Sequence, residues 1–177
     1  MPRRHKVFIS YHHKRDENYK RIFEKLFGKS YISKSVEIGY INPNLKTETI
    51  RQKIRDEYLR ESTVTVVLVG SETWKRKHVD WEISSSIRHT QLNPRSGLLG
   101  IILPTHPNYR TNTYNQYIIP PRLIDNIKCG YAKINKWTQN NYNIQNWIHT
   151  AFLRKNRVLP ENSRLMFKNN RSGLRWY

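Results

Sequence analysis

The sequence predicts an α/β fold in which helices cover both faces of a mostly parallel, five-stranded sheet, a doubly wound arrangement. Residues 63–69 form a nearly continuous β-branched run, which is typical of a central parallel strand buried on both faces. Residues 16–28 carry apolar side chains at helical spacing. Segments of these two kinds alternate along the chain, and this alternation favours a parallel sheet wound with helices.

The first strand and helix give the clearest local signals. Residues 6–10 form a short apolar strand that stops at the polar segment 11–15. Asp16 is the expected N-cap of the helix that follows, and Gly28 is its expected end. The apolar residues of this helix recur with helical spacing, at Tyr19, Ile22, Phe23, Leu26 and Phe27.

The rest of the chain continues the alternation. A weaker strand is expected at residues 35–41, followed by a loop at 42–44 and a second helix from about Thr47. A third helix over residues 78–90 should turn Trp81 outward and an apolar stripe inward, made up of Val79, Ile83 and Ile87. The later elements are a strand at 98–103, a long loop at 104–121, a strand near 128–134 and a helix near 142–155.

The composition of the chain narrows the cellular compartments in which the protein is expected and the kinds of chemical site that it can hold. The hydrophobic share is 37% and aromatic residues make up 12%, which is enough apolar material for one packed core. The single cysteine, Cys129, excludes an internal disulfide and a multi-cysteine zinc site. The charged N-terminus is followed by no long apolar segment, and the longest apolar runs are too short to span a bilayer. We therefore expect a cytoplasmic protein without membrane contact.

The formal net charge of +19 creates a field that attracts polyanions, including nucleic acid and phosphate-bearing small molecules. The Lys and Arg residues are spread along the whole chain, and no zinc finger or RNA-binding aromatic signature accompanies them. Nucleic-acid binding is therefore expected to be non-specific at most.

Glu82 is the strongest candidate for a catalytic carboxylate. On a helix, His78 and Glu82 lie one turn apart on a stripe that borders the apolar face, so Glu82 is partly desolvated at the rim of the sheet. Asp80 faces elsewhere, which disfavours a paired-carboxylate glycosidase site. The His12–His13 pair has no third ligand at a suggestive spacing, so no metal site is expected. An ordinary surface charge is the competing interpretation of Glu82.

Three segments together resemble the TIR domain family. The sequence VFISYHHKRD at residues 7–16 resembles the opening strand and loop of that family. VVLVGSETWKRKHVDWE at 66–82 resembles its central strand, turn and glutamate-bearing helix, and residues 98–104 resemble the next strand. Specifically, the chain resembles the TIR-like branch that includes the TIR subunit of Thoeris antiphage defence.

The likeness covers roughly residues 5–155. It implies one TIR-like domain at residues 1–155 with a flavodoxin-like fold, followed by a C-terminal extension of unknown role at 156–177. One departure concerns the tryptophan that many TIR enzymes carry four residues before the glutamate. This chain has His78 there, and Trp74 stands one turn earlier.

The resemblance implies an enzyme that cleaves the nicotinamide–ribose bond of NAD, an NAD nucleosidase or ADP-ribosyl cyclase, with Glu82 as the catalytic residue. NAD is then a substrate, and no permanently bound cofactor is expected. The implied product is ADP-ribose, a cyclic isomer or a conjugate, which signals to a separate effector protein in antiphage defence. The segments that flank the substrate in the family correspond here to Ser10, Tyr11, His12, Lys14, Arg15, Asn42, Asn44, Trp74 and His78.

Two other functions stay open. TIR domains commonly act through homo-oligomers or TIR–TIR assemblies, so a non-catalytic signalling scaffold is the main alternative. A basic nucleic-acid-binding domain is the weaker one, and it rests only on the net charge.

Overall fold

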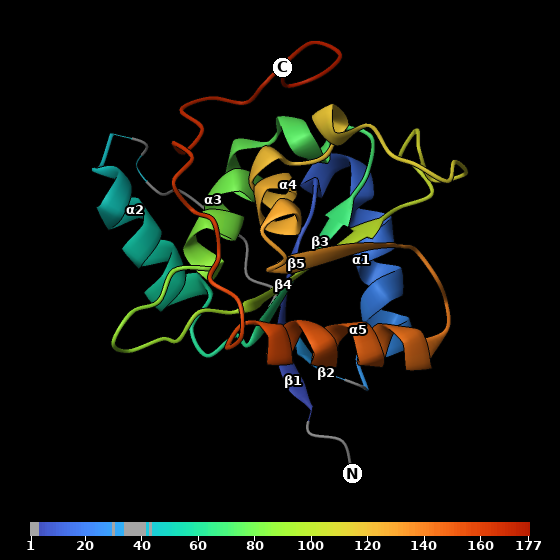
Figure 1. The fold of residues 1–177 in the computed structure, drawn as a ribbon, viewed down its shortest axis with the longest axis horizontal. Coiled ribbons are helices and arrows are strands. Elements are labelled where there is room, and N and C mark those ends of the chain that lie inside the picture. Colours follow the sequence, from blue (N-terminus) through green and yellow to red (C-terminus); the bar gives the residue numbers. More distant parts are fainter. Residues whose placement is uncertain (1–3, 30, 34–41, 43) are drawn as a thin grey trace.

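A computed structural model describes residues 4–29, 31–33, 42 and 44–177, and it confirms the α/β class (Figure 1). The strands form one sheet in the order β2-β1-β3-β4-β5, and every pairing is parallel. The strand bounds are β1 His5–Ser10, β2 Tyr31–Ser33, β3 Val64–Val69, β4 Gly97–Ile102 and β5 Ala132–Lys136.

Helices cover both faces of this sheet. Helices α1 (His13–Phe27) and α5 (Asn141–Arg154) pack on one face, and α3 (Lys77–Ser86) and α4 (Pro121–Lys128) pack on the other. Helix α2 (Thr47–Lys53) runs on into a π-helical turn, Ile54–Tyr58, and packs beside α3. Short 3₁₀ turns at Thr73–Lys75 and Gln116–Ile118 precede α3 and α4.

Strand β3 shows why the sheet is central to the core. Its side chains alternate between the two faces: Val66 and Leu68 pack with α1 and α5, whereas Val67 and Val69 pack with α3 and α4. All six residues of the strand are buried. The continuous β-branched run therefore has the two-sided burial that the sequence predicts.

Several boundaries differ from the sequence prediction. The strand expected at residues 35–41 lies outside the described residues, and β2 ends before it. Helix α4 was not expected, although Pro121 occupies its first turn and Leu123 and Ile124 are buried. Eight residues give barely two turns of periodicity, so this helix is hard to recognise. Because α4 extends to Lys128, the last strand begins later than predicted.

The chain after α5 runs back along α3 and α4 (Figure 1). Phe167 of this C-terminal tail is buried, and its carbonyl oxygen accepts a hydrogen bond of 2.8 Å from Trp81 Nε1. Trp81 was predicted to face outward, and that prediction is wrong because α2 and the tail cover it. No helix in the described part of the chain combines the length and apolarity needed to cross a bilayer.

Candidate functional site

The candidate site lies where β1 and β3 end. In parallel α/β sheets, ligands bind beyond the carboxyl ends of the strands. Strand β1 ends at Ser10, which aligns with Val67 of β3, and α3 packs against this edge. The hydroxyl group of Ser10 therefore faces the helix that carries Glu82, and so does the loop that follows Ser10.

Helix α3 presents three faces to three surroundings. Val79 and Ile83 pack into the core beneath the sheet. Asp80, Trp81 and Ser84 contact the C-terminal tail. The third face, which carries His78 and Glu82, contacts the end of β1. The helix that carries Glu82 is therefore held by the core on one face and by the C-terminal tail on another.

The Glu82 carboxyl group is buried, and its side-chain hydrogen-bond partner in the described part of the chain is a hydroxyl group. Its residue is 1% exposed, and Ser10 Oγ donates a hydrogen bond to Glu82 Oε2. Among the described residues no cationic side chain forms an ion pair with it. Burial raises the pKa of Glu82 to about 8, and the hydrogen bond from Ser10 only partly opposes this. Glu82 is therefore largely protonated near neutral pH until a cationic group approaches.

His78 is fixed in one tautomer beside Glu82. Its Nε2 lies 3.0 Å from the carbonyl oxygen of Tyr11, and a carbonyl can only accept, so Nε2 carries the hydrogen. Burial lowers the pKa of His78 to about 4, and the nearby positive charges of His13 and Arg76 add to this. The imidazole is therefore neutral, with the Nδ1 lone pair unprotonated.

His13 completes a small cluster of rings. Its ring centroid lies 4.5 Å from that of His78 and 4.6 Å from that of Tyr11. Ligand atoms of His13, His78 and Glu82 all lie within 4.8 Å of one another, so these three residues could hold a metal ion. The fold thus brings two further candidate ligands, His78 and Glu82, close to His13. The expectation of no metal site considered only residues near His13 in the sequence, and this geometry departs from it. Two imidazoles and a carboxylate are a donor set typical of Zn²⁺.

A second buried carboxylate lies nearby. Asp16 is 1% exposed and accepts a hydrogen bond of 3.2 Å from Thr105 Oγ1, while its Oδ2 has no hydrogen-bond partner among the described residues. Burial raises its pKa. A Cβ atom at Gly70 would lie 2.2 Å from Asp16 Oδ2, so glycine is needed for this approach. Asp16 was predicted to be the N-cap of α1, but His12 holds that position, because its side chain accepts from the Arg15 amide.

The structure brings together Ser10, Tyr11, His78 and Glu82 from the predicted site. Tyr11 is buried, and its hydroxyl donates to Glu17 Oε2. Three other predicted residues form the rim on α1 and its cap. His12 is buried, Lys14 is exposed, and Arg15 Nε lies 2.6 Å from a carboxylate oxygen of Glu72.

The remaining predicted residues lie elsewhere. Trp74 is 2% exposed and sits in the 3₁₀ turn before α3. Asn42 and Asn44 are exposed, and Asn42 Oδ1 accepts from the Asn44 amide at 2.9 Å. Asn44 lines a cavity of about 770 Å³ between α2, α3 and the tail, and Glu82 is not among the lining residues of that cavity.

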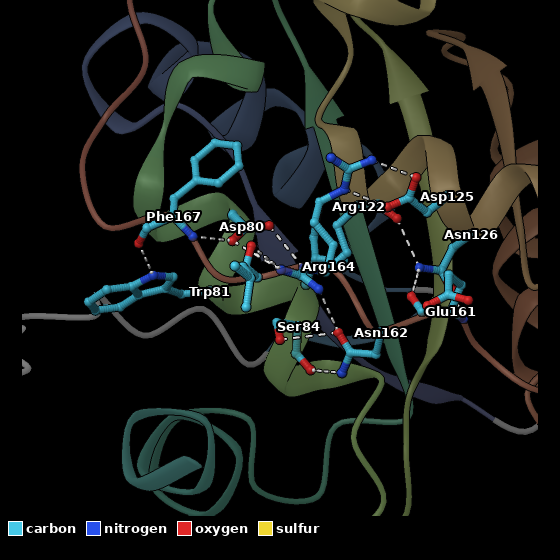
Figure 2. A network of polar contacts seen from close by, with 12 residues as sticks. Asp80, Trp81, Ser84, Arg122, Asp125, Asn126, Glu161, Asn162, Arg164 and Phe167 are labelled. Atoms are coloured by element: carbon cyan, nitrogen blue, oxygen red, sulfur yellow. Dashed lines mark hydrogen bonds and ion pairs between the residues drawn. The ribbon is translucent and has the colours of Figure 1, made fainter. Parts of the chain in front are cut away.

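The tail ties α3 to α4 through a buried polar network (Figure 2). Arg122 of α4 donates from Nε to Asp80 Oδ1 at 2.9 Å, and both side chains are almost fully buried. The Phe167 amide donates to Asp80 Oδ2 at 2.9 Å. Asn162 Oδ1 accepts from Arg122 and from the Ser84 hydroxyl, and Asn162 Nδ2 donates to the Ser84 carbonyl oxygen at 2.9 Å.

Sequence reasoning gave Asp16 only a capping role and did not predict the buried contacts of Asp16, Asp80, Arg122 or Asn162. Their partners lie between 40 and 89 positions away along the chain, so no local spacing marks them. His13 was noticed only as half of a histidine pair. Its approach to His78 depends on the pairing of β1 with β3, which a single sequence does not display.

Comparison with known proteins gives a family for this arrangement. The family model described as the TIR-like domain of Thoeris protein ThsB matches residues 8–108, more than half of the chain. A solved structure also matches, described as the activated Roq1 resistosome directly recognizing the pathogen effector XopQ (TIR domains). It has 12% identity and a TM-score of 0.38, over 86% of this chain and 84% of that chain. No curated protein matches the sequence.

Proposed function

The chain belongs to the family of the TIR-like domain of Thoeris protein ThsB, and from this premise we propose that it cleaves NAD between nicotinamide and ribose. The observation that carries the proposal is Glu82, a buried carboxyl group that forms no ion pair with the described residues and lies at the carboxyl ends of the strands, where ligands bind in such sheets. Such a group favours a ligand that brings positive charge to it.

The nicotinamide riboside part of NAD brings that charge. When the C1′–N1 bond breaks, its electron pair goes to the nicotinamide nitrogen, so nicotinamide leaves as a neutral molecule. The positive charge passes to the ribose as an oxocarbenium ion. The Glu82 carboxylate stabilises that ion and accepts hydrogen bonds from ribose hydroxyls, with Ser10 holding one carboxylate oxygen.

Other residues near the edge suit the rest of the substrate. Lys14 and Arg15 stand in the first turn of α1, where their positive charge and the helix dipole favour a pyrophosphate. Tyr11 and His13 offer rings for stacking. These roles predict that Arg15→Ala raises KM for NAD more than it lowers kcat.

The fate of the ribosyl cation defines the product. Attack by water gives ADP-ribose and a proton, an internal nitrogen gives a cyclic isomer, and another small molecule gives a conjugate. We propose that the product is a signalling nucleotide and that a separate effector protein responds to it. NAD is consumed as a substrate in every case.

A scaffold function without catalysis is favoured by one observation. Glu82 is 1% exposed and bonded to Ser10, which also suits a purely structural carboxyl group. In that case TIR–TIR assembly carries the signal.

The test compares wild type with Glu82→Gln. Concentrated protein is incubated with NAD, with and without lysate of phage-infected cells, and the products are resolved by mass spectrometry. We expect nicotinamide release by wild type and at least a hundredfold loss in Glu82→Gln. Glu57→Gln, the same change on an exposed helical position, is the matched control and keeps activity. If wild type consumes no NAD under any condition, the enzyme proposal fails and the scaffold function replaces it.

A further inference from the structure

A cationic cavity of about 240 Å³ lies at the opposite edge of the sheet from Glu82. Arg95 on its wall stands two residues before the amino end of β4, and Lys155 directly follows α5. The ionisable residues that line it are His89, Arg95, Lys155 and Arg157, and no Asp or Glu is among the lining residues.

These four basic side chains are not matched by acidic ones in the described part of the chain. None of the four forms an ion pair with a carboxylate in the described part of the chain. Lys155 is only 9% exposed, and its Nζ lies 4.5 Å from the centroid of the Phe152 ring. Burial lowers the pKa of Lys155, and the charge of Arg55 lowers it further.

Arg55 lies directly behind the cavity wall. It is fully buried, its Nη2 donates to the carbonyl oxygen of Pro94 on the wall, and its Nη1 donates to Ser96 Oγ at 3.0 Å. Its Nε has no hydrogen-bond partner among the described residues. The negative charge of Asp56 acts on Arg55, but the Asp56 carboxylate accepts its hydrogen bond from Asn93 and not from Arg55.

Among the described residues, no carboxylate bonds to Arg55 and none lines the cavity. A buried guanidinium bonded only to neutral groups is costly, and neighbouring cations add repulsion. An anion in the cavity removes both penalties, and Arg side chains match the oxygens of a phosphoryl group. We propose that this cavity is a binding site for a phosphate-bearing small anion, separate from the NAD site.

The size of the cavity restricts the ligand. A volume of about 240 Å³ equals roughly the liquid share of eight water molecules and is below the usual range for drug-sized ligands. It accommodates a phosphate or pyrophosphate group but not a whole dinucleotide. A nucleic-acid backbone is disfavoured, because a concave site with a buried Arg55 behind it does not present its charge along a groove.

The test measures binding of inorganic phosphate and pyrophosphate by thermal shift and titration calorimetry, against sodium chloride at equal ionic strength. We expect pyrophosphate to raise the Tm of wild type. Arg95→Ala and Arg157→Ala should each weaken binding by about tenfold, because each removes a charge-assisted hydrogen bond. Arg110→Ala removes the same charge from an exposed loop and should bind as wild type does.

Circular dichroism checks that each variant is folded. If either Arg95→Ala or Arg157→Ala does not fold, the other variant still tests the proposal. The proposal is overturned if neither anion shifts the Tm beyond chloride. Equal weakening by Arg110→Ala overturns it as well. It is also overturned if a single-stranded oligonucleotide binds while pyrophosphate does not, since that result assigns the charge to nucleic-acid contact. None of these outcomes depends on NAD cleavage.

Discussion

At the scale of single residues, Glu82 takes up a proton when the chain folds. Burial raises its pKa from 4.5 to about 8, so between these values the folded state binds more protons than the unfolded state. The free energy of unfolding therefore falls as the pH rises through this interval. One pKa unit corresponds to about 1.4 kcal/mol, so the effect is on the order of several kcal/mol at alkaline pH.

This predicts that Glu82→Gln becomes more stable relative to wild type as the pH rises. A neutral glutamine keeps an acceptor for Ser10 and has no charge to bury. Thermal unfolding at pH 5.5 and pH 9 measures the difference, which should be small at the first pH and several degrees at the second. Glu57→Gln, in an exposed position, should show no such trend. Parallel pH profiles of wild type and Glu82→Gln would contradict the burial of an uncompensated carboxyl group.

Activity should rise with pH, whereas the free energy of unfolding of wild type falls. The proposed chemistry needs the ionised carboxylate, and the free enzyme holds Glu82 protonated below about pH 8. We therefore expect kcat/KM for NAD to rise with pH and to level off above about 8. Initial rates from pH 6 to 9.5 test this, and a flat profile across that range would exclude Glu82 as the titrating group.

The cluster of His13, His78 and Glu82 predicts inhibition by Zn²⁺. A bound ion occupies the carboxylate that the oxocarbenium ion needs, and His78 presents its Nδ1 lone pair. We expect micromolar Zn²⁺ to suppress NAD cleavage and EDTA to restore it. His13→Ala should require at least tenfold more Zn²⁺, whatever its own rate. Loss of activity on adding EDTA alone would mean instead that the metal is required.

At the scale of elements, α3 depends on a segment about 80 positions later in the chain. Asn162 bridges Ser84 of α3 and Arg122 of α4, and it makes both contacts with one side chain (Figure 2). Asn162 is half-buried, and removing its side chain takes one hydrogen-bond partner from Arg122 and two from Ser84, which are both buried. Asn162 therefore positions the helix that carries Glu82 without touching the candidate site.

We predict that Asn162→Ala costs about 1–3 kcal/mol and lowers kcat more than it changes KM. Hydrogen exchange should rise in α3 while the amides of β3 stay protected. Asn169→Ala changes an exposed tail residue and is the control that keeps both readouts. Uniformly faster exchange across the sheet would indicate general destabilisation rather than a positioning role.

The elements with strong periodicity were predicted well from sequence. The β-branched run of β3 and the Phe23/Phe27 stripe of α1 lie in the core as expected. Helix α4 is too short for its apolar residues to show helical periodicity. Trp81 was predicted to face outward because helical spacing does not reveal that a distant tail covers it. Long-range partners are set by strand order, so local pattern could not reveal them.

The candidate site was predictable only in part. The position of Glu82 at the rim of the sheet was predicted from helical spacing, and its catalytic role stays a prediction that rests on the family resemblance. The burial of Glu82, the tautomer of His78 and the approach of His13 depend on side chains from three elements, and a single sequence does not reveal them.

At the scale of the whole molecule, the positive charge is distributed rather than gathered into one stripe. The chain has 32 Lys and Arg residues against 13 Asp and Glu, so most cations have no acidic partner to bind. Such a surface attracts nucleic acid mainly through counterion release.

We predict that the protein binds single- and double-stranded DNA at low salt without sequence preference. Because the interaction is electrostatic, affinity should fall by orders of magnitude between about 50 and 200 mM salt. Fluorescence anisotropy with two unrelated oligonucleotides measures this. Binding that differs strongly between the oligonucleotides, or that persists at high salt, would instead indicate a specific nucleic-acid site.

The tail contacts also set an order of events during synthesis. Domains form from the N-terminus as the chain emerges from the ribosome, and the residues that bind Asp80, Trp81 and Ser84 emerge after β5 and α5. The sheet and α4 can assemble while these residues are still inside the exit tunnel. Helix α3 therefore gains its final support only after the rest of the sheet has formed, so a nascent chain that has not yet exposed residues 162–167 lacks a fully fixed Glu82.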